Sequence, residues 1–117
     1  MKTVNVIKDK SYAFAVRIVK VYQYLCTEKK EFVLSKQLLR CGTSIGANIE
    51  EATGGQSKKD FFAKLTISYK EARETHYWIR LLTETGYINK EQSKSLLADV
   101  TELLKIIGSI QKTIRNS

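Results

Sequence analysis

The chain has 117 residues, which is enough for one domain with its own hydrophobic core. Hydrophobic residues make up 43% and charged residues 27%, as is ordinary for a globular protein. Lys and Arg number 20 against 12 Asp and Glu, and the net charge of +8 favours an anionic partner. No segment approaches the run of about 18 apolar residues that a membrane span needs. The N-terminus also lacks the apolar core of a secretory signal, so we expect a cytoplasmic protein.

Apolar residues recur at steps of three and four along four segments, which predicts four amphipathic helices. The predicted helices span roughly residues 7–29, 35–53, 58–85 and 90–115. The buried stripe of the first helix is predicted to consist of Ile7, Ser11, Phe14, Ile18, Val21 and Leu25. The chain contains no proline, which is compatible with few, long helices.

The second predicted helix starts near Ser35, a suitable N-cap, and ends before Gly54 and Gly55. Its interior contains Gly42 and Gly46, although each glycine inside a helix costs about 1 kcal/mol relative to alanine. Glycines four residues apart lie on the same helix face. We therefore expect a neighbouring helix to approach closely at this pair.

The third predicted helix opens with Ser57 and Asp60, a pattern that resembles a capping box, and ends at Gly86. The fourth is capped by Asn89. The connections between the predicted helices are short, which makes consecutive helices antiparallel. The expected fold is all-α, a single antiparallel up-down-up-down four-helix bundle over residues 1–117.

The sequence offers little support for catalysis or metal binding. Cys26 and Cys41 lack metal-ligand spacing, and their expected offset along the helices argues against a disulfide, so we expect reduced thiols. A di-iron bundle needs Glu-x-x-His on two helices, but His76 does not follow Glu71 or Glu74 at that spacing. We therefore expect no catalytic residues, no metal and no cofactor.

Polar residues on the second and third predicted helices can meet across the bundle. A structural polar network is predicted among Arg40, Asn48, Glu51 and Glu74. The alternative is that these side chains form a solvated surface with weak ion pairs. For Glu71 we favour this solvated surface.

Basic residues share a face of the third predicted helix with Tyr77, away from its apolar stripe. The predicted nucleic-acid-binding residues are Lys59, Lys70, Arg73 and Arg80, with Arg17 and Lys20 of the first helix as an extension. Phosphate contacts carry no sequence information, so binding is expected to be non-specific. The alternative is that these cations only confer solubility.

Two blocks of residues follow the signature of a known family. The first block is Arg40 with Ser44-Ile45-x-Ala47-Asn48-Ile49-x-Glu51. The second block is Phe61-Phe62-x-x-Leu65-x-Ile67-Ser68, then Glu71-Ala72-x-Glu74-Thr75-x-Tyr77-Trp78-Ile79-x-Leu81-Leu82. Over nearly the whole chain, the sequence resembles the four-helix-bundle family of proteins encoded in 23S ribosomal RNA intervening sequences. Ala52 departs from the family pattern, which commonly has glycine at that position.

This resemblance implies a ring-shaped homopentamer with a positively charged surface that binds nucleic acid. Related proteins include the accessory variability proteins of diversity-generating retroelements. An aromatic surface near Tyr77 and Trp78, or the first and last helices, would fit an oligomer interface. The favoured function is a non-catalytic, oligomeric, nucleic-acid-binding protein. The alternatives are a protein–protein adaptor whose charge is incidental and, less favoured, an enzyme with carboxylates in the bundle core.

Overall fold

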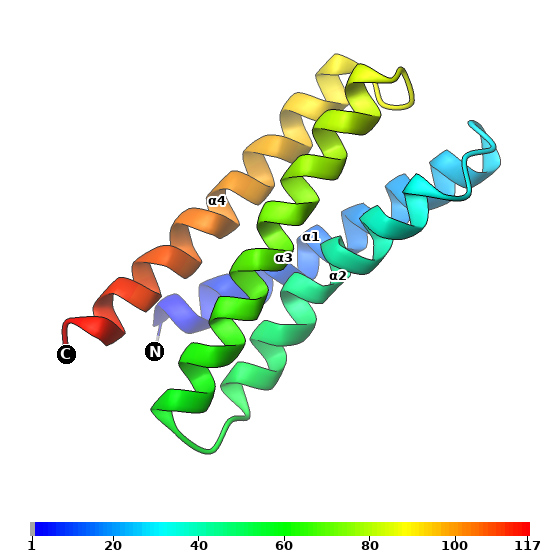
Figure 1. Cartoon of the computed structure of the whole chain (residues 1–117). Helices are drawn as coiled ribbons and strands as arrows, with labels where there is room; N and C mark the ends of the chain where they lie inside the picture. The colour runs from blue at the N-terminus through cyan, green and yellow to red at the C-terminus, as the bar shows by residue number, and fades with distance from the viewer. Residues whose placement is uncertain (1) are drawn as a thin grey trace.

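The computed structural model describes residues 2–117, which form four α-helices joined by short turns (Figure 1). The helices are α1 (Lys2–Thr27), α2 (Leu34–Thr53), α3 (Lys58–Glu84) and α4 (Lys90–Arg115). No strand occurs within these residues. The prediction of an all-α up-down-up-down bundle is confirmed, although α1 begins at Lys2 rather than near residue 7.

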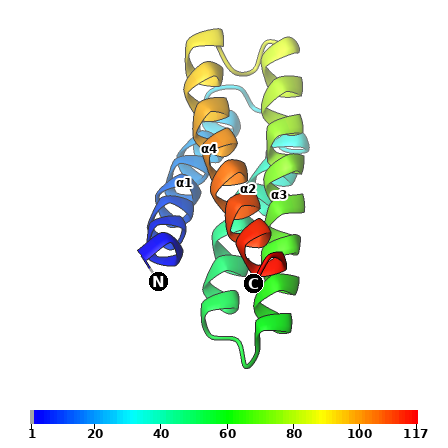
Figure 2. The ribbon, with the colours of Figure 1, turned by 90° about the vertical axis from the view of Figure 1, so that its left-hand side faces the viewer.

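The bundle is elongated and measures 47 × 21 × 19 Å. Among the described residues, α1 and α3 each pack against α2 and α4, and the diagonal pairs do not come close. We call the four lines of contact between neighbouring helices seams. The α1–α2 and α3–α4 turns lie at one end, and both termini and the α2–α3 turn lie at the other (Figures 1 and 2).

The predicted apolar stripes form the core. All six residues predicted for the α1 stripe are buried. On the other helices, fully buried side chains such as Ile45, Ile79 and Leu103 continue the same core. Removing this apolar surface from water stabilises the fold by about 25 cal/mol per Å².

The glycines of α2 allow close contact with α1. A Cβ atom on Gly46 would lie 3.2 Å from the backbone carbonyl oxygen of Ser11. A Cβ atom on Gly42 would lie 2.8 Å from the side chain of Ile18, which is fully buried. The sequence therefore correctly predicted a close approach at this pair of glycines, and α1 is the helix that approaches.

The start of α2 differs from the prediction, because Ser35 is not the N-cap. The carboxylate of Glu31 accepts hydrogen bonds from the backbone N–H groups of Val33, Leu34 and Ser35, at 2.8–3.1 Å. The Ser35 hydroxyl in turn donates to the Glu31 carbonyl oxygen at 2.8 Å. One buried carboxylate therefore satisfies the free N–H groups that a short polar side chain usually caps.

The predicted caps of α3 and α4 are present. The Ser57 hydroxyl accepts from the backbone N–H of Asp60 at 3.1 Å. The Asn89 side chain accepts from the N–H of Gln92 at 2.7 Å. Between these helices Gly86 has a φ of +87°, a left-handed conformation in which other residues are strained. The Gly86 turn and the Asn89 cap connect α3 to α4 by a short turn.

Candidate nucleic-acid interface

Ion pairs cross three of the four seams. The cross-helix pairs are Lys8–Glu50, Lys10–Glu102, Arg17–Asp99, Lys64–Glu51, Arg40–Glu71 and Arg40–Glu74. They join α1 to α2, α1 to α4, and α2 to α3. Within residues 2–117 no ion pair crosses the α3–α4 seam. Two neutral contacts cross it instead, Thr83 to Ser93 at 2.8 Å and Gln111 to Thr66 at 2.9 Å.

Between those two contacts the α3–α4 seam is an open groove. Three hollows adjoin one another, two of them lined by both helices and one by α4 alone. Each pair of hollows shares one residue, which is Arg80, Leu97 or Thr101, and we call their union the α3–α4 groove. From α3 it is lined by Tyr69, Arg73, His76, Arg80, Thr83 and Glu84. From α4 it is lined by Lys90, Ser93, Lys94, Leu97, Ala98, Thr101, Glu102, Leu104 and Lys105.

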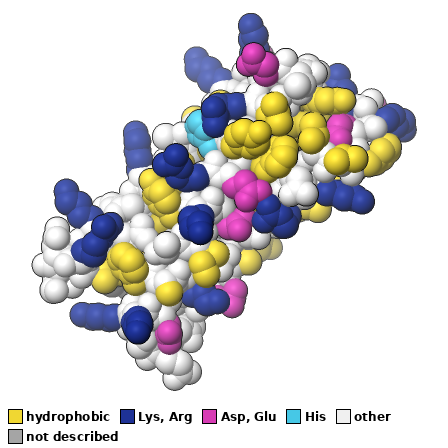
Figure 3. All heavy atoms as spheres, in the orientation of Figure 1, with side chains coloured by type: hydrophobic (Ala, Val, Ile, Leu, Met, Phe, Trp, Pro, Cys, Tyr) yellow, Lys and Arg dark blue, Asp and Glu magenta, His cyan; other side chains and the backbone are white. Residues whose placement is uncertain are grey.

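The charge of this groove is strongly positive. Its cations are Arg73, Arg80, Lys90, Lys94 and Lys105, and all are exposed. Two carboxylates also line it. Glu102 pairs with Lys10 of α1 at 3.2 Å, and Glu84 forms no ion pair within the described chain. Figure 3 shows the single histidine beside Lys and Arg side chains on the face that α3 presents to the viewer. The groove therefore offers an anion several cations that no intramolecular carboxylate neutralises.

Arg80 is held in place within the groove. Its Nε donates a hydrogen bond to His76 Nδ1 at 3.1 Å, and its guanidinium lies 5.9 Å from the centre of the Tyr77 ring. Burial, and then the charges of Arg80 and Arg73, lower the pKa of His76 below its ordinary value of 6.5. The imidazole is therefore neutral at pH 7 and can accept the Arg80 hydrogen bond.

Of the four nucleic-acid-binding residues predicted on α3, two line the groove and two lie outside it. Arg73 and Arg80 line the α3–α4 groove. Lys59 and Lys70 are exposed on the same helix but do not line it. The α4 lysines were not among the residues predicted for this surface. A signal for them was available, because consecutive antiparallel helices place the start of α4 beside the end of α3.

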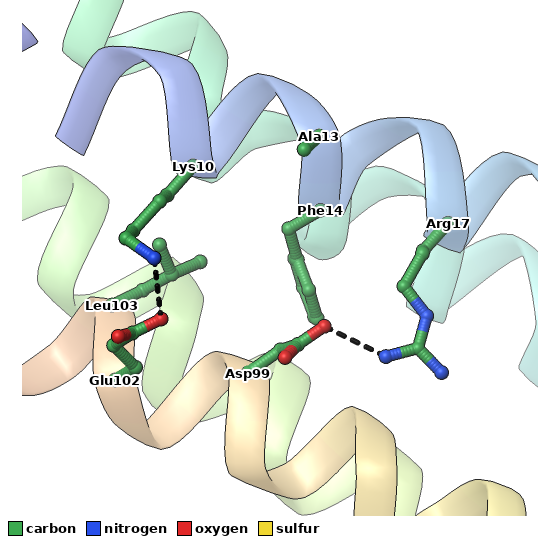
Figure 4. Close-up of a pocket in the computed structure, with 7 residues that line it drawn as sticks. All are labelled: Lys10, Ala13, Phe14, Arg17, Asp99, Glu102 and Leu103. Atoms are coloured by element: carbon green, nitrogen blue, oxygen red, sulfur yellow. Dashed lines mark hydrogen bonds and ion pairs between the residues drawn. The ribbon is translucent and has the colours of Figure 1, made fainter. Parts of the chain in front are cut away.

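The residues predicted on α1 do not extend this surface. Arg17 Nη1 lies 2.7 Å from Asp99 of α4, and Lys10 pairs with Glu102 one turn away (Figure 4). These pairs and Phe14 line a cavity of about 230 Å³ in the α1–α4 seam. Lys20 is exposed on α1, which does not pack against α3. Arg17 is therefore neutralised, and Lys20 is separate from the groove.

Part of the predicted polar network meets across α2 and α3. Arg40 bonds to both Glu74 and Glu71, with a distance of 3.3 Å to Glu71. The indole Nε1 of Trp78 donates to Glu74 at 3.1 Å, so one carboxylate joins an arginine and a tryptophan. Glu71, for which a solvated surface with weak ion pairs was favoured, pairs with Arg40, and the Arg40 side chain is 50% exposed.

The other two predicted members lie outside this network. The Asn48 side chain donates to the Ser44 carbonyl oxygen at 2.8 Å, within α2. Glu51 pairs with Lys64 at 3.2 Å. At 1.5 Å of rise per residue, Glu51 lies roughly 16 Å along the helix from Arg40, beyond the reach of either side chain. The network is therefore shorter than predicted.

Other chemical groups form no recognisable centre. Cys26 and Cys41 are free thiols, and burial raises the pKa of Cys41 to about 11. Residues 2–117 contain no group of three or more His, Cys, Asp or Glu side chains arranged to bind a metal. None of the described helices has a stretch long and apolar enough to cross a membrane.

Fold and groove together define a small antiparallel four-helix bundle with one cationic seam. Residues 3–109 match the 23S rRNA-intervening sequence protein family, and the chain belongs to this family. The fold is similar to the crystal structure of a protein of unknown function from the S23 ribosomal protein family of Bacteroides thetaiotaomicron. The TM-score is 0.93, and the two are 57% identical over 94% of this chain and 98% of that chain. No curated protein matches the chain.

Proposed function

We propose that this chain is a cytoplasmic, non-catalytic, homo-oligomeric protein that binds RNA or DNA non-specifically through its basic helix faces. The observation that carries this proposal is the charge pattern of the seams. Three seams pair their cations with carboxylates, whereas the α3–α4 groove gathers cations from both helices without such partners.

Nucleic acid is the anion that best fits this arrangement. Like charges on facing helices repel one another, and a polyanion that lies along the groove relieves this repulsion at several positions at once. The exposed cations include Arg73 and Arg80, whose guanidinium groups suit bidentate contacts with phosphate. Lys59 and Lys70, which are exposed on α3 outside the groove, would add further phosphate contacts.

Salt dependence tests the electrostatic part of the proposal. Phosphate contacts release condensed counterions, so affinity should fall with salt at a log–log slope of about −0.7 per phosphate neutralised on a single strand and about −0.9 on a duplex. Fluorescence anisotropy with labelled oligonucleotides of several sequences would measure it. Affinity that does not depend on salt would contradict the proposal and favour the protein–protein adaptor.

Charge reversal locates the binding surface. Arg73→Glu with Arg80→Glu should abolish binding to all sequences alike, because repulsion replaces phosphate contacts. The matched control is Lys29→Glu with Lys36→Glu, which changes the net charge equally on exposed residues of the α1–α2 half. Equal loss of binding in both variants would show that net charge, and not the groove, determines affinity.

We propose that copies of the chain associate through the outer face of α1. Tyr12, Val16 and Val19 follow one another at steps of four and three, and each is at least 38% exposed. Exposed apolar stripes of this kind mark interfaces. Trp78, which the sequence analysis associated with the interface, is half-buried, and its indole nitrogen bonds to Glu74.

Light scattering tests this assembly. The family resemblance implies five copies, which would give a mass of about 67 kDa for a 13.4 kDa chain. Val16→Asp should lower the mass, because it places a charge in the interface. Ala63→Asp, at an exposed position on α3, is the control. A monomeric mass for the unaltered protein would contradict the proposal of an oligomer.

A further inference from the structure

We propose that the α3–α4 groove contains a seat for one phosphodiester group, formed by Arg73, His76 and Arg80. This inference rests on the proposed function and deepens it. It assigns the phosphate to particular atoms and makes the only histidine of the chain a sensor of its occupancy.

The three side chains belong to one hollow. They follow one another at steps of three and four on α3, which places them on one helix face. The hollow has a volume of about 430 Å³ and is closed on the α4 side by Thr101 and Leu104. No Asp or Glu of the described chain lines it, so an anion meets no carboxylate there. Thr101 and Tyr69, whose side chains each carry a hydroxyl group, also line it.

The donors of this seat are already organised. His76 Nδ1 accepts from Arg80 Nε, so the neutral imidazole carries its hydrogen on Nε2 and remains a donor there. The same bond, together with the Tyr77 ring, restrains Arg80 and leaves both of its Nη groups for a ligand. A guanidinium fork of this kind matches two phosphate oxygens. Less side-chain entropy is lost on binding when the donor is held in advance.

Occupancy of the seat should change the protonation of His76. In the free protein, burial and then the charges of Arg80 and Arg73 lower the pKa of His76. A phosphate between the two arginines opposes their charges and favours the imidazolium ion. The other charged groups along the groove are Glu84 of α3, which with Lys90 lines the hollow that adjoins the seat at Arg80, and three further residues of α4. These three are Lys94 and Lys105, and Glu102, which pairs with Lys10. The anion should thus raise the pKa of His76 and bind more tightly as pH falls. Protonation breaks the hydrogen bond from Arg80 Nε, because both nitrogens of the imidazolium are donors, and turns Nδ1 into a further donor.

The experiment follows this imidazole by NMR. Because the chain has one histidine, its ring C2–H resonance needs no assignment by mutation. We would titrate the resonance with pH in the free protein, with a short oligothymidylate, and with inorganic phosphate. Oligothymidylate should raise the pKa of His76 by about 0.5 unit or more, since the anion offsets the nearby arginines. Inorganic phosphate should shift it in the same direction.

Two variants separate a seat from general attraction. Arg73→Gln should abolish the shift that oligothymidylate induces and weaken its binding several-fold. Lys36→Gln removes an equal charge from an exposed position on α2, outside the hollow, so the induced shift should persist. The comparison uses the change on adding ligand, because Arg73→Gln by itself also alters the pKa of His76.

The outcomes distinguish this inference from the proposed function. If oligothymidylate binds but the His76 resonance does not respond, the seat is overturned and nucleic-acid binding stands. If inorganic phosphate moves the resonance but oligothymidylate does not, the site takes free phosphate and the phosphodiester seat is overturned. If no nucleic acid binds at any salt concentration, the proposed function fails together with the seat.

Discussion

In the α1–α2 seam the backbones lie so close that a Cβ atom on Gly46 would be 3.2 Å from the Ser11 carbonyl oxygen. In the α3–α4 seam a Cβ atom on Gly108 would meet nothing closer than the Tyr69 ring, at 3.8 Å. The first seam is closely packed and bridged by an ion pair, whereas the second is open and lined by cations. One bundle therefore has a seam that fixes the fold and another that leaves room and charge for a ligand.

The largest expected effect follows from the close contact of α2 with α1. Gly46→Leu should destabilise the protein by about 3 kcal/mol, because the added side chain meets backbone and not a flexible side chain. Chemical denaturation measures the free energy of unfolding. An unchanged midpoint would show that the α1–α2 seam can open and would remove the contrast between the two seams.

A second difference lies in the turns. Glu31 caps α2 with three hydrogen bonds to backbone N–H groups, whereas Asn89 caps α4 with one. Glu31→Ala should cost about 2 kcal/mol and Asn89→Ala about 1 kcal/mol, near the upper end and the middle of the range for caps. Equal losses in thermal unfolding would show that the extra N–H bonds of Glu31 add nothing.

The same carboxylate predicts a dependence of stability on pH. Burial alone would raise the pKa of Glu31, but hydrogen bonds from the N–H groups of Ser35, Val33 and Leu34 lower it below 4.5. A lowered folded pKa adds stability above the ordinary value, and this stability is lost as pH falls through the folded pKa. Unfolding curves between pH 7 and about pH 3 should therefore converge for wild type and Glu31→Gln. A constant difference across this range would contradict the role of the Glu31 charge.

These two turns also show what the sequence could predict. The apolar stripes and the caps of α3 and α4 depend on residue type and local spacing, so they were predicted correctly. The Glu31 cap was missed, because Glu is not a usual N-cap residue. Glu31 also follows Lys30 in the chain, and the φ of +53° at Lys30 could not be predicted from its residue type.

The candidate site was less predictable than the core. The cationic face of α3 could be predicted from spacing, since Arg73 and Arg80 are seven residues apart, about two helical turns. Which of the cations are neutralised depends on contacts between distant residues. Arg17 and Asp99 are 82 residues apart in sequence, and their pairing depends on how α1 and α4 are rotated about their axes. Which α4 residues line the groove also depends on how α4 is rotated about its axis.

A smaller effect compares glycines in the two seams. Gly108→Ala should stabilise the protein by about 0.5–1 kcal/mol, because alanine favours the helix and the new methyl group makes only ordinary contacts. Gly46→Ala should instead destabilise it, although the helix propensity gained is the same. If both variants gain stability in denaturant unfolding, the α1–α2 contact is looser than the distance to Ser11 indicates.

The smallest expected effect concerns charge. Arg17→Gln removes an ion pair with Asp99 that is partly exposed, so it should cost less than about 1 kcal/mol. Arg73→Gln breaks no ion pair and relieves repulsion in the α3–α4 groove, so the free energy of unfolding should stay the same or rise slightly. Both variants lose one positive charge, which removes the effect of net charge from the comparison. Raising the salt concentration should reduce the difference between them, since salt screens exposed charges. If Arg73→Gln destabilises the protein more than Arg17→Gln does, Arg73 supports the fold, and the contrast between a structural seam and a seam kept open for an anion fails.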